Sequence, residues 1–265
     1  MIKVEHIIKS FEGKTILKDV STTFEAGKTN LIIGQSGSGK TVLLKCLVGL
    51  LRPDTGKILY GDKDIVTMKR HELKSLRTEI GMLFQGSALF DSMTVLENVS
   101  FPLTMFTNFS KAEIYKRAMF CIERVNLLHA PNLYPSEISG GMQKRVAIAR
   151  AIALNPKYLF CDEPNSGLDP KTSLVIDELI HDITKEYNIT TVINTHDMNS
   201  VMGIGETITF INQGEVGWIG DKDKILNTNN KVLNDFVFAS DLFQKVREVA
   251  VAEEEAESSG KILSR

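Results

Sequence analysis

The chain has 265 residues, of which 43% are hydrophobic and 24% are charged, and its formal net charge at pH 7 is −2. This length and composition are typical of a globular protein with one large domain and a sizeable core. The near-neutral charge argues against a general nucleic-acid binder, which normally carries a basic surplus, so we expect no nucleic-acid partner.

The sequence contains neither a disulfide framework nor a membrane span. Its three cysteines, at positions 46, 121 and 161, are few and widely spaced, which favours a reducing compartment. Charges at Lys3, Glu5 and Lys9 interrupt the apolar core that a signal peptide needs. The longest apolar stretch, residues 43–51, is too short for a bilayer and contains Lys45. We expect a chain of cytoplasmic character that reaches a membrane only through a partner.

The N-terminal part of the chain predicts short strands and one early helix. Apolar and polar residues alternate around a turn at residues 12–14, which indicates two antiparallel strands. Residues 40–51 have the length and periodicity of a helix, which we expect Pro53 to close. The predicted strands are residues 2–8, 15–24, 29–34, 57–61 and 81–85.

The C-terminal part begins with a helical pattern from about residue 94 to residue 154 and then returns to alternating strands and helices. The predicted elements are a strand at 158–164, a helix at 173–187, a strand at 190–197 and a hairpin at 206–220. Strands and helices therefore alternate on both sides of an all-helical segment. The predicted fold is α/β, with a mainly parallel core, an antiparallel β-subdomain and an inserted α-helical subdomain.

Residues 34–41, GQSGSGKT, match the pattern G-x-x-x-x-G-K-[ST] between a predicted strand and a predicted helix. Glycines let successive backbone N–H groups face a phosphate, and the helix N-terminus adds a partial positive charge. Lys40 would reach the β- and γ-phosphates, and the Thr41 hydroxyl would bind Mg²⁺. The pattern predicts a nucleoside triphosphate site formed by Gly34, Gln35, Ser36, Gly37, Ser38, Gly39, Lys40, Thr41 and Val42.

A second motif lies about 120 residues further along the chain, where an apolar strand ends in Asp162 and Glu163. A buried strand delivers such carboxylates to the sheet edge at which α/β proteins bind ligands. Asp162 suits a Mg²⁺ ligand, and Glu163 suits the group that orients and polarises an attacking water.

The third motif, ISGGMQ, places Ser139, Gly140 and Gly141 at a predicted helix start, which is a second anion-binding N-terminus in the same chain. Two phosphate-binding segments for one nucleotide favour a head-to-tail pair in which each segment serves a different subunit. Because both half-sites are complete on one chain, a two-fold homodimer would contain two competent sites.

Together with Gln85, the segment SGLD (166–169) and His196 in NTHD, these motifs make the sequence resemble the ATPase subunits of ABC transporters over roughly residues 2–220. The resemblance implies a P-loop NTPase fold of the RecA-like type, with ATP and Mg²⁺ as cofactors. It implies that Glu163, His196 and Gln85 are catalytic, and that Thr41, Gln85 and Asp162 hold the metal.

Further roles follow from the same resemblance. Phe11 would stack on adenine; the alternative is that it is an ordinary apolar residue of the hairpin. Ser139, Gly140 and Gly141 would hold the γ-phosphate of the neighbour's ATP, and Asp169 would lie at the dimer seam. Two positions depart from the common pattern, Met142 in place of Gln and Asn165 in place of Thr or Ser, and both leave the phosphate donors and carboxylates intact.

Within the family, residues 86–103, the segment SGGMQKR and residues 235–240 look most like the Mla-type (maintenance of lipid asymmetry) phospholipid transport ATPases. This resemblance implies a peripheral subunit on the cytoplasmic face of the inner membrane. Its partners would be an integral membrane permease, a membrane-anchored lipid-binding subunit and a small regulatory subunit. The alternatives are the ATPase of another transporter and a soluble iron–sulfur assembly ATPase.

Other ABC classes fit less well. A DNA-repair ATPase would carry a long heptad insert between the P-loop and ISGGMQ, and a translation factor would carry two cassettes.

The domain organisation follows from these patterns. Residues 1–220 are expected to form the ABC-type ATP-binding domain, with the helical subdomain at about 86–155. Residues 221–250 form a helical extension, and residues 251–265 form an acidic tail that we expect to be disordered. The helix expected at 231–238 could pack on its own domain or bridge to a neighbouring ATPase.

Residues 84–95, FQGSALFDSMTV, follow the strand that leads to Gln85 and are rich in apolar residues. We expect these residues to divide between the core of the helical subdomain and a surface that faces the permease. The apolar residues concerned are Ala88, Leu89, Phe90, Met93 and Val95.

Overall fold

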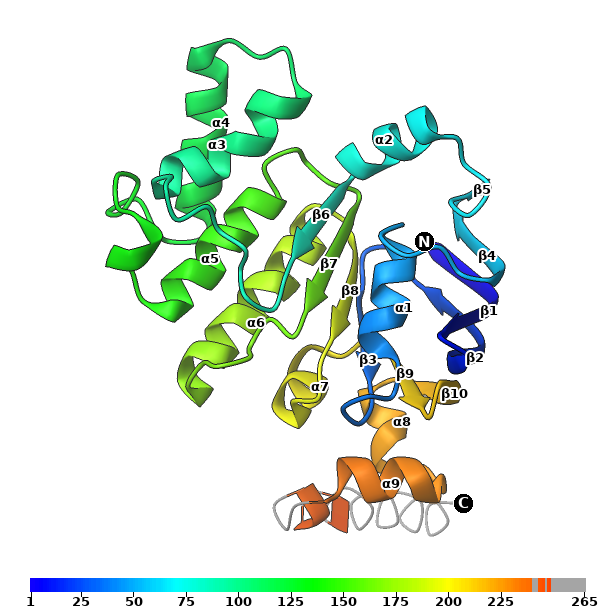
Figure 1. Ribbon diagram of the computed structural model, residues 1–265. Helices are drawn as coiled ribbons and strands as arrows, with labels where there is room; N and C mark the ends of the chain where they lie inside the picture. Colours follow the sequence, from blue (N-terminus) through cyan, green and yellow to red (C-terminus); the bar gives the residue numbers. More distant parts are fainter. Residues whose placement is uncertain (240–242, 246, 249–265) are drawn as a thin grey trace, which may run out of the picture.

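A six-stranded sheet lies at the centre of the computed structural model, which describes residues 1–239, 243–245 and 247–248 (Figure 1). The strand order is β10-β9-β3-β8-β7-β6, and all neighbours are parallel except the closing hairpin of β9 and β10. The strands are β3 (Thr29–Ile33), β6 (Ile80–Leu83), β7 (Tyr158–Asp162), β8 (Thr190–Asn194), β9 (Thr207–Asn212) and β10 (Glu215–Gly220). The mainly parallel core is therefore confirmed.

A second sheet is antiparallel, with the order β2-β1-β4-β5. Its strands are β1 (Ile2–Phe11), β2 (Lys14–Phe24), β4 (Thr55–Tyr60) and β5 (Lys63–Asp64). This sheet is the antiparallel β-subdomain of the predicted fold class, which is confirmed.

The helices lie around the central sheet, and α3, α4 and α5 form a separate group at the upper left of Figure 1. This group is the inserted helical subdomain of the predicted fold. The helices are α1 (Lys40–Leu47), α2 (Arg70–Thr78), α3 (Val95–Phe106), α4 (Lys111–Arg124), α5 (Gly140–Ala151), α6 (Pro170–Glu186), α7 (Met198–Ile204), α8 (Lys222–Leu226) and α9 (Lys231–Val237), with a 3-10 turn at Pro135–Glu137. No helix among the described residues is long and apolar enough to cross a membrane.

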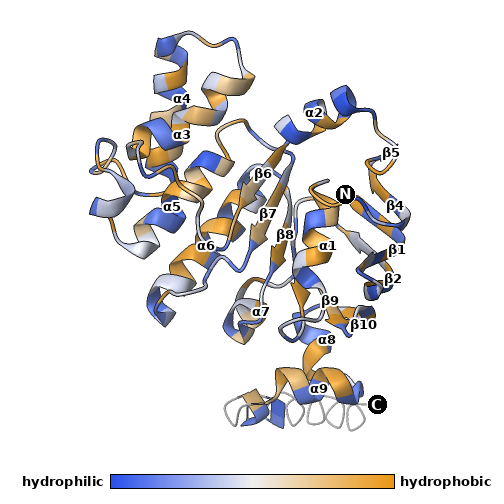
Figure 2. Ribbon diagram, viewed as in Figure 1, coloured by the Kyte–Doolittle hydropathy of each residue, from blue (hydrophilic) through white to orange (hydrophobic). Residues whose placement is uncertain are grey.

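Alternate residues of the parallel strands belong to two different cores. Leu159 and Cys161 of β7 pack in the core that contains α5 and α6, whereas Phe160 packs in the core that contains α1 and the antiparallel sheet. Because both faces are covered, β3, β7 and β8 are buried along almost their whole length. Figure 2 shows the hydrophobic character of β6 and β7. The burial of β7 holds its polar end, Asp162, at the edge of the sheet.

The first helix is shorter than predicted. It ends at Leu47, because Gly49 adopts φ +67° and the N–H groups of Leu50 and Leu51 turn back to the carbonyl of Lys45. The helix therefore stops before Pro53 is reached. The strand predicted at 81–85 likewise ends at Leu83, which leaves Gln85 in a turn.

Helix α2 was not predicted. Leu76 is its only buried residue, and Leu73 and Leu76 are the only apolar residues of the segment, which are too few to indicate a helix. Within residues 94–154 the helices are separated by a non-helical segment at 125–134.

The C-terminal helices α8 and α9 pack on the chain's own domain. Ile225, Leu233 and Val237 are buried, and the ring of Phe236 stacks on Phe210 of β9 at 5.5 Å between centroids. The helix expected at 231–238 therefore packs on its own domain, and Val232 remains exposed. The acidic tail 251–265 and the last residue of segment 235–240 lie outside the described residues.

Candidate active site

The P-loop connects β3 to α1 and depends on its glycines. Gly34, Gly37 and Gly39 have φ values of +148°, +79° and +109°. A Cβ atom at Gly34 would lie 2.2 Å from the carbonyl oxygen of Ile211. Gly39 is the N-cap of α1 and has no side chain to accept a bond from the first helical N–H groups. These groups are therefore available to an anion.

Lys40 is the cation of this loop, and it is 7% exposed. Its Nζ donates to the carbonyl oxygens of Gly34 at 2.7 Å and Gln35 at 3.1 Å, so the lysine spans the curl of the loop. Burial lowers the pKa of Lys40, and the negative charges of Glu163 and Asp162 oppose this shift. The ammonium group of Lys40 has negative charges only at a distance, on Glu163 and Asp162. A phosphate bound in the loop would supply a negative charge in direct contact with it.

Two oxygen donors meet beside the P-loop. The Thr41 hydroxyl lies 3.5 Å from Asp162 Oδ1, which also accepts a hydrogen bond of 3.0 Å from Asn194 Nδ2. Asp162 is 9% exposed at the end of β7. One carboxylate and one hydroxyl beside a phosphate site are a donor set that Mg²⁺ uses, because this ion keeps several waters and takes oxygen ligands from the nucleotide. The residues present therefore fit the ion.

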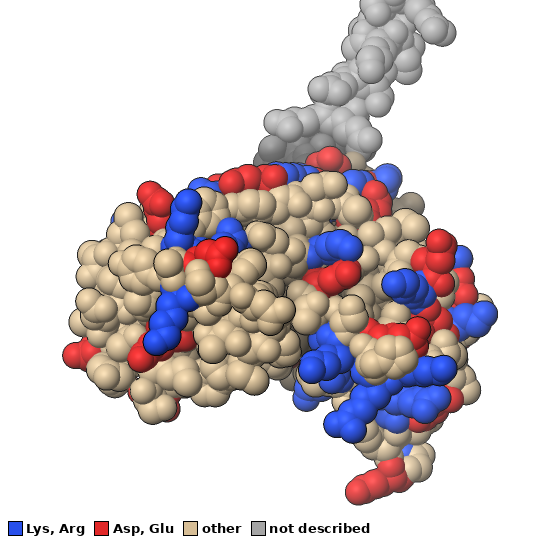
Figure 3. Space-filling model, turned by 90° about the horizontal axis from the view of Figure 1, so that it is seen from above, with Lys and Arg blue, Asp and Glu red and all other residues tan. Residues whose placement is uncertain are grey.

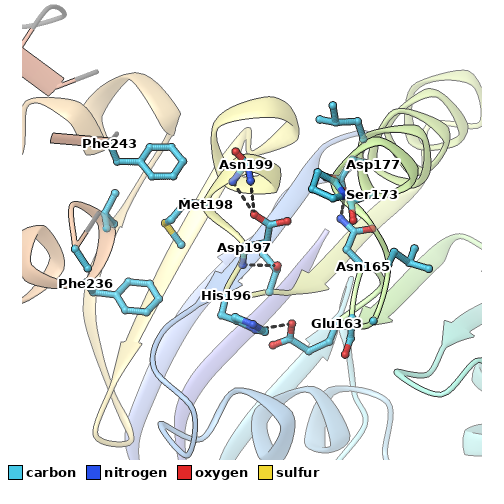
Figure 4. A pocket seen from close by; sticks show the side chains of 18 residues that line it. Glu163, Asn165, Ser173, Asp177, His196, Asp197, Met198, Asn199, Phe236 and Phe243 are labelled. Atoms are coloured by element: carbon cyan, nitrogen blue, oxygen red, sulfur yellow. Dashed lines mark hydrogen bonds and ion pairs between the residues drawn. The ribbon is translucent and has the colours of Figure 1, made fainter. Parts of the chain in front are cut away.

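Glu163 and His196 form a close pair at the same edge of the sheet (Figure 4). Glu163 Oε2 lies 2.8 Å from His196 Nδ1, and the glutamate side chain is 15% exposed while the histidine is 67% exposed. Glu163 has φ +50°, a left-handed conformation that a residue with a Cβ atom rarely adopts. Its N–H donates to the carbonyl of Asn194 at 3.0 Å, which joins the turn to the end of β8.

Gln85 connects three parts of the molecule. Its Nε2 donates to Ser166 Oγ at 3.2 Å, and its carbonyl accepts a hydrogen bond from Nζ of the buried Lys144 on α5. The turn that contains Gln85 thus touches both the segment after Glu163 and the helical subdomain.

Ser139 is the N-cap of α5, and its Oγ accepts a hydrogen bond of 3.3 Å from the Met142 N–H. Gly141 lies so close to α6 that a Cβ atom would come within 2.6 Å of Thr172 Cγ2. Asp169 caps α6 by accepting from the Thr172 N–H at 3.0 Å, and its bonds with Thr172 lower the pKa of Asp169.

These two helix starts share a hollow of about 480 Å³ that is lined by Ser139, Gly140, Gly141, Asp169 and Thr172. The lining contains no residue of the P-loop. Within a single chain, residues 139–141 therefore do not share this hollow with the P-loop.

Phe11 lies at the end of β1 with 41% of its surface exposed, and Lys9 Nζ lies 5.3 Å from the centre of its ring. The ring is therefore not a core residue of the hairpin.

The stretch 84–95 divides between core and surface. Val95 is fully buried, whereas Phe84 and Phe90 are 39% and 40% exposed. Ala88 is exposed, and Leu89 and Met93 are half-buried. The Phe90 ring packs against Phe101 of α3 with 4.7 Å between centroids.

Two polar residues that the sequence did not single out, the buried Asn98 and the half-buried Arg150, shape this stretch. Asn98 is fully buried, and its side chain bonds the backbone of Phe90, Met93 and Thr94 at 2.9–3.1 Å. Arg150 donates to the carbonyls of Ser87 at 2.8 Å and Ala88 at 2.7 Å, where both residues have positive φ. Their only signal in the sequence is a polar residue inside an apolar helical pattern.

Comparisons with known proteins agree with this geometry. A family model described as "ABC transporter" matches residues 17–166. The chain is 40% identical over 237 residues to the methionine import ATP-binding protein MetN of Clostridioides difficile. The aligned region covers 89% of this chain and 74% of MetN. It is also 36% identical over 258 residues to the probable ribonucleotide transport ATP-binding protein mkl of Mycobacterium leprae. That aligned region covers 97% of this chain and 73% of mkl.

Solved structures are similar as well. A dimeric post-hydrolysis state of the ATP-binding cassette MJ0796, bound to ADP and Pi, has a TM-score of 0.77 and 34% identity, and covers 84% of this chain and 99% of that chain. The structure of cbiO1 from Clostridium perfringens, part of the ABC transporter complex cbiONQ, has a TM-score of 0.80 and 29% identity, and covers 92% and 98%. The matched family model and these relatives show that the chain belongs to the ABC transporter family, as an ATP-hydrolysing cassette of the kind that pairs with a membrane permease.

Proposed function

We propose that this cassette drives phospholipid transport between the inner and outer membranes, and that the residues described above divide the work of ATP hydrolysis. The P-loop residues 34–42 bind the phosphates, with Lys40 on the β- and γ-phosphates, and Phe11 stacks on the adenine. The observation that carries the ATPase assignment is the convergence of Lys40, Asp162 and the Glu163–His196 pair at one edge of the sheet.

Thr41, Asp162 and Gln85 would hold Mg²⁺, which when bound neutralises charge on the β- and γ-phosphates. Glu163 would accept a proton from the attacking water, and His196, which contacts that carboxylate, would bind the γ-phosphate. The 2.8 Å contact between them orients the glutamate before the nucleotide arrives.

The segment 139–141 and Asp169 serve the second copy of the chain. They line a hollow without P-loop residues, so their phosphate ligand would be the ATP of the partner cassette. ATP would then favour the closed dimer, and hydrolysis would release it, which is a ligand-driven shift between two arrangements.

The partner-facing surface lies over the helical subdomain. Seen from above, the half of the molecule that carries α3 and α4 shows a broad surface with few charges (Figure 3). Phe90 before α3, and Met105, Phe106 and Phe109 at and after its C-terminal end, each expose at least 40% of their surface. An integral permease docks on this surface, which places the cassette peripherally on the cytoplasmic face of the inner membrane. A membrane-anchored lipid-binding subunit and a small regulatory subunit complete the complex.

The phospholipid assignment is supported by the resemblance of residues 86–103 and SGGMQKR to the Mla-type ATPases. The experiment reconstitutes the chain with the permease encoded beside it and measures ATP-dependent transfer of labelled phospholipid between vesicles. Transfer that is absent with Glu163→Gln supports the proposal, and normal ATPase activity with no lipid transfer contradicts it.

Methionine import is a second candidate, favoured by the 40% identity to MetN over 89% of the chain. The same proteoliposomes distinguish the two functions. ATP-dependent uptake of labelled methionine without lipid transfer would establish import, whereas lipid transfer without uptake would exclude it.

Phe90→Asp is expected to uncouple the cassette from its permease. The backbone of Phe90 stays bonded to Asn98, while a charge replaces the exposed ring at the docking surface. Burying that charge without a partner costs enough to lower permease-stimulated hydrolysis about tenfold. ATP binding should be unchanged, as measured with a fluorescent ATP analogue.

The matched control is Val232→Asp, which adds the same charge at a residue 50% exposed on α9, at the far end of the molecule from α3 (Figure 1). Stimulation by the permease should survive in this variant. A loss of ATP binding in Phe90→Asp would instead mean that Phe90 belongs to the core.

A further inference from the structure

A polar cluster of Asn165, Asp177 and Ser200 lies near the Glu163–His196 pair, and Figure 4 shows Asn165 and Asp177 above Glu163. The amide Nδ2 of Asn165 donates to Asp177 Oδ1 at 2.8 Å and to Ser200 Oγ at 3.1 Å. Asp177 and Ser200 are 3% and 1% exposed. Such buried polar groups are costly unless they are bonded, so the cluster strongly restrains the elements that carry it.

The cluster joins the segments that carry the two active-site side chains. Asn165 follows Glu163 by two residues, and Ser200 on α7 follows His196 by four. Asp177, on the buried face of α6, accepts the 2.8 Å bond from Asn165, and the Ser200 hydroxyl, which Asn165 also bonds, lowers the pKa of this carboxyl. One carboxylate therefore holds the turn after β7 and the helix after β8 in a fixed relation.

We propose that Asp177 is a positioning residue, which acts through Asn165 and Ser200 to fix the geometry of the Glu163–His196 pair. This inference rests on the roles proposed above for Glu163 and His196. It adds a requirement for hydrolysis that lies outside the nucleotide-binding motifs.

The backbone at Glu163 needs such a restraint. Its φ of +50° is a conformation that persists only when surrounding contacts enforce it. The turn is closed by the Ser166 N–H bonding to the Glu163 carbonyl at 3.1 Å and the Leu168 N–H bonding to the Asn165 carbonyl at 3.1 Å. The Asn165 side chain ties this closed turn to α6 and α7.

The amide of Asn165 suits this position better than a hydroxyl. Thr or Ser at this position would have one hydrogen to donate and could satisfy only one acceptor. Asn165 donates to two acceptors, and its Oδ1 is buried with no partner among the described residues. The donor side of the amide is therefore the part that the structure uses.

Asp177 faces few charges. Burial raises the pKa of Asp177 to about 6, against the bonds from Ser200 and Asn165, and the negative charge of Asp197 at the start of α7 adds to the rise. The Cys161 thiol on β7 also faces Asp177. Glu163 and His196 line the same cavity of about 650 Å³, whose opposite wall includes Phe236 and Val237.

The first test measures ATP hydrolysis and ATP binding by the full-length chain. Asp177→Ala removes the shared acceptor, and a small displacement of a catalytic group is enough to lower kcat about tenfold. KM for ATP should stay within about twofold, because the P-loop does not touch the cluster. Asp177→Asn keeps the shape and one acceptor oxygen, so it should restore most of kcat.

The coupling between residues gives a second readout. If Asn165 and Asp177 act as one unit, Asn165→Ala and Asp177→Ala should lower kcat by similar factors, and the double variant should be no slower than either. The control is Thr184→Val, which removes a buried hydroxyl from the same helix α6 away from the cluster. It should lower the Tm without lowering kcat.

Thermal unfolding tests the titration of Asp177. The pKa in the folded state, about 6, lies above the unfolded value of 3.8, so the native state takes up the proton first as the pH falls. The Tm of the wild type should therefore rise relative to that of Asp177→Asn between pH 7 and pH 5. If the difference in Tm between the wild type and Asp177→Asn is the same at pH 7 and at pH 5, the assignment of this titration to Asp177 is overturned.

The outcomes separate the two proposals. A normal kcat in Asp177→Ala, with hydrolysis abolished in Glu163→Gln, overturns the positioning role and leaves the proposed function standing. Normal turnover in Glu163→Gln removes the proposed catalytic role itself. A loss of kcat in Asp177→Ala that Thr184→Val reproduces at equal Tm also overturns the inference, since general destabilisation then explains it.

Discussion

Glu163→Gln is expected to abolish steady-state ATP hydrolysis while ATP still binds. The amide keeps the size of the side chain and its place beside His196, but it cannot accept a proton from water. Proton transfer by a positioned group contributes about 10²–10⁴-fold, so the rate should fall by at least about 100-fold. The check is phosphate release under saturating ATP, together with the affinity for a fluorescent ATP analogue.

The same variant should accumulate an ATP-bound dimer, because binding closes the pair and hydrolysis no longer opens it. Size-exclusion chromatography with and without ATP measures this directly. Glu79→Gln is the matched control, since it makes the same change at a surface residue paired with Lys157 at 3.1 Å. Its rate and oligomeric state should equal those of the wild type. Normal turnover in Glu163→Gln would contradict the role of this carboxylate.

Lys40→Met should weaken ATP binding by about 100-fold, which corresponds to about 2.7 kcal/mol. Methionine fills a similar volume, but it removes the ammonium that bonds the phosphates, and charge-assisted bonds of this type contribute about 1.5–3 kcal/mol. In the absence of nucleotide, the same ammonium bonds the carbonyls of Gly34 and Gln35. Binding is measured by titration with the fluorescent analogue.

Lys45→Met provides the control for Lys40→Met. It removes the same charge from the same helix at an exposed position in its last turn. ATP affinity should stay within about twofold of the wild type, because an exposed charge contributes little at that distance through water. An equal loss of affinity in both variants would show that the net charge of α1, and not the contact of Lys40, governs binding.

The motifs could be assigned from the sequence because their chemistry is local. The P-loop needs its glycines and Lys40 within a few residues of one another, and Asp162 with Glu163 ends a strand whose apolar run is visible in the sequence. The parallel core was predictable for the same reason, since β3, β7 and β8 are apolar on both faces.

The supporting residues could not be assigned in this way. Asp177 on α6 has the polarity of a solvent-facing helix residue, and only the packing of β7 and α7 against α6 shows that it is 3% exposed. Asn98 and Arg150 are similar cases, because their bonds reach backbone groups that the sequence does not place next to them. Helix α2 was missed because only Leu76 is buried there.

The sequence by itself determined the nucleotide chemistry, the α/β class and the family, because these depend on residue types at short and regular spacings. Only the tertiary structure decided how FQGSALFDSMTV divides, with Val95 in the core and Phe90 on the surface. It also decided that α9 packs on its own domain. The buried carboxylate of Asp177 bonds Asn165, two residues after Glu163, and this contact too is visible only in the folded molecule. These contacts join residues far apart in the chain, and burial, which sets their energies, is a property of the folded molecule.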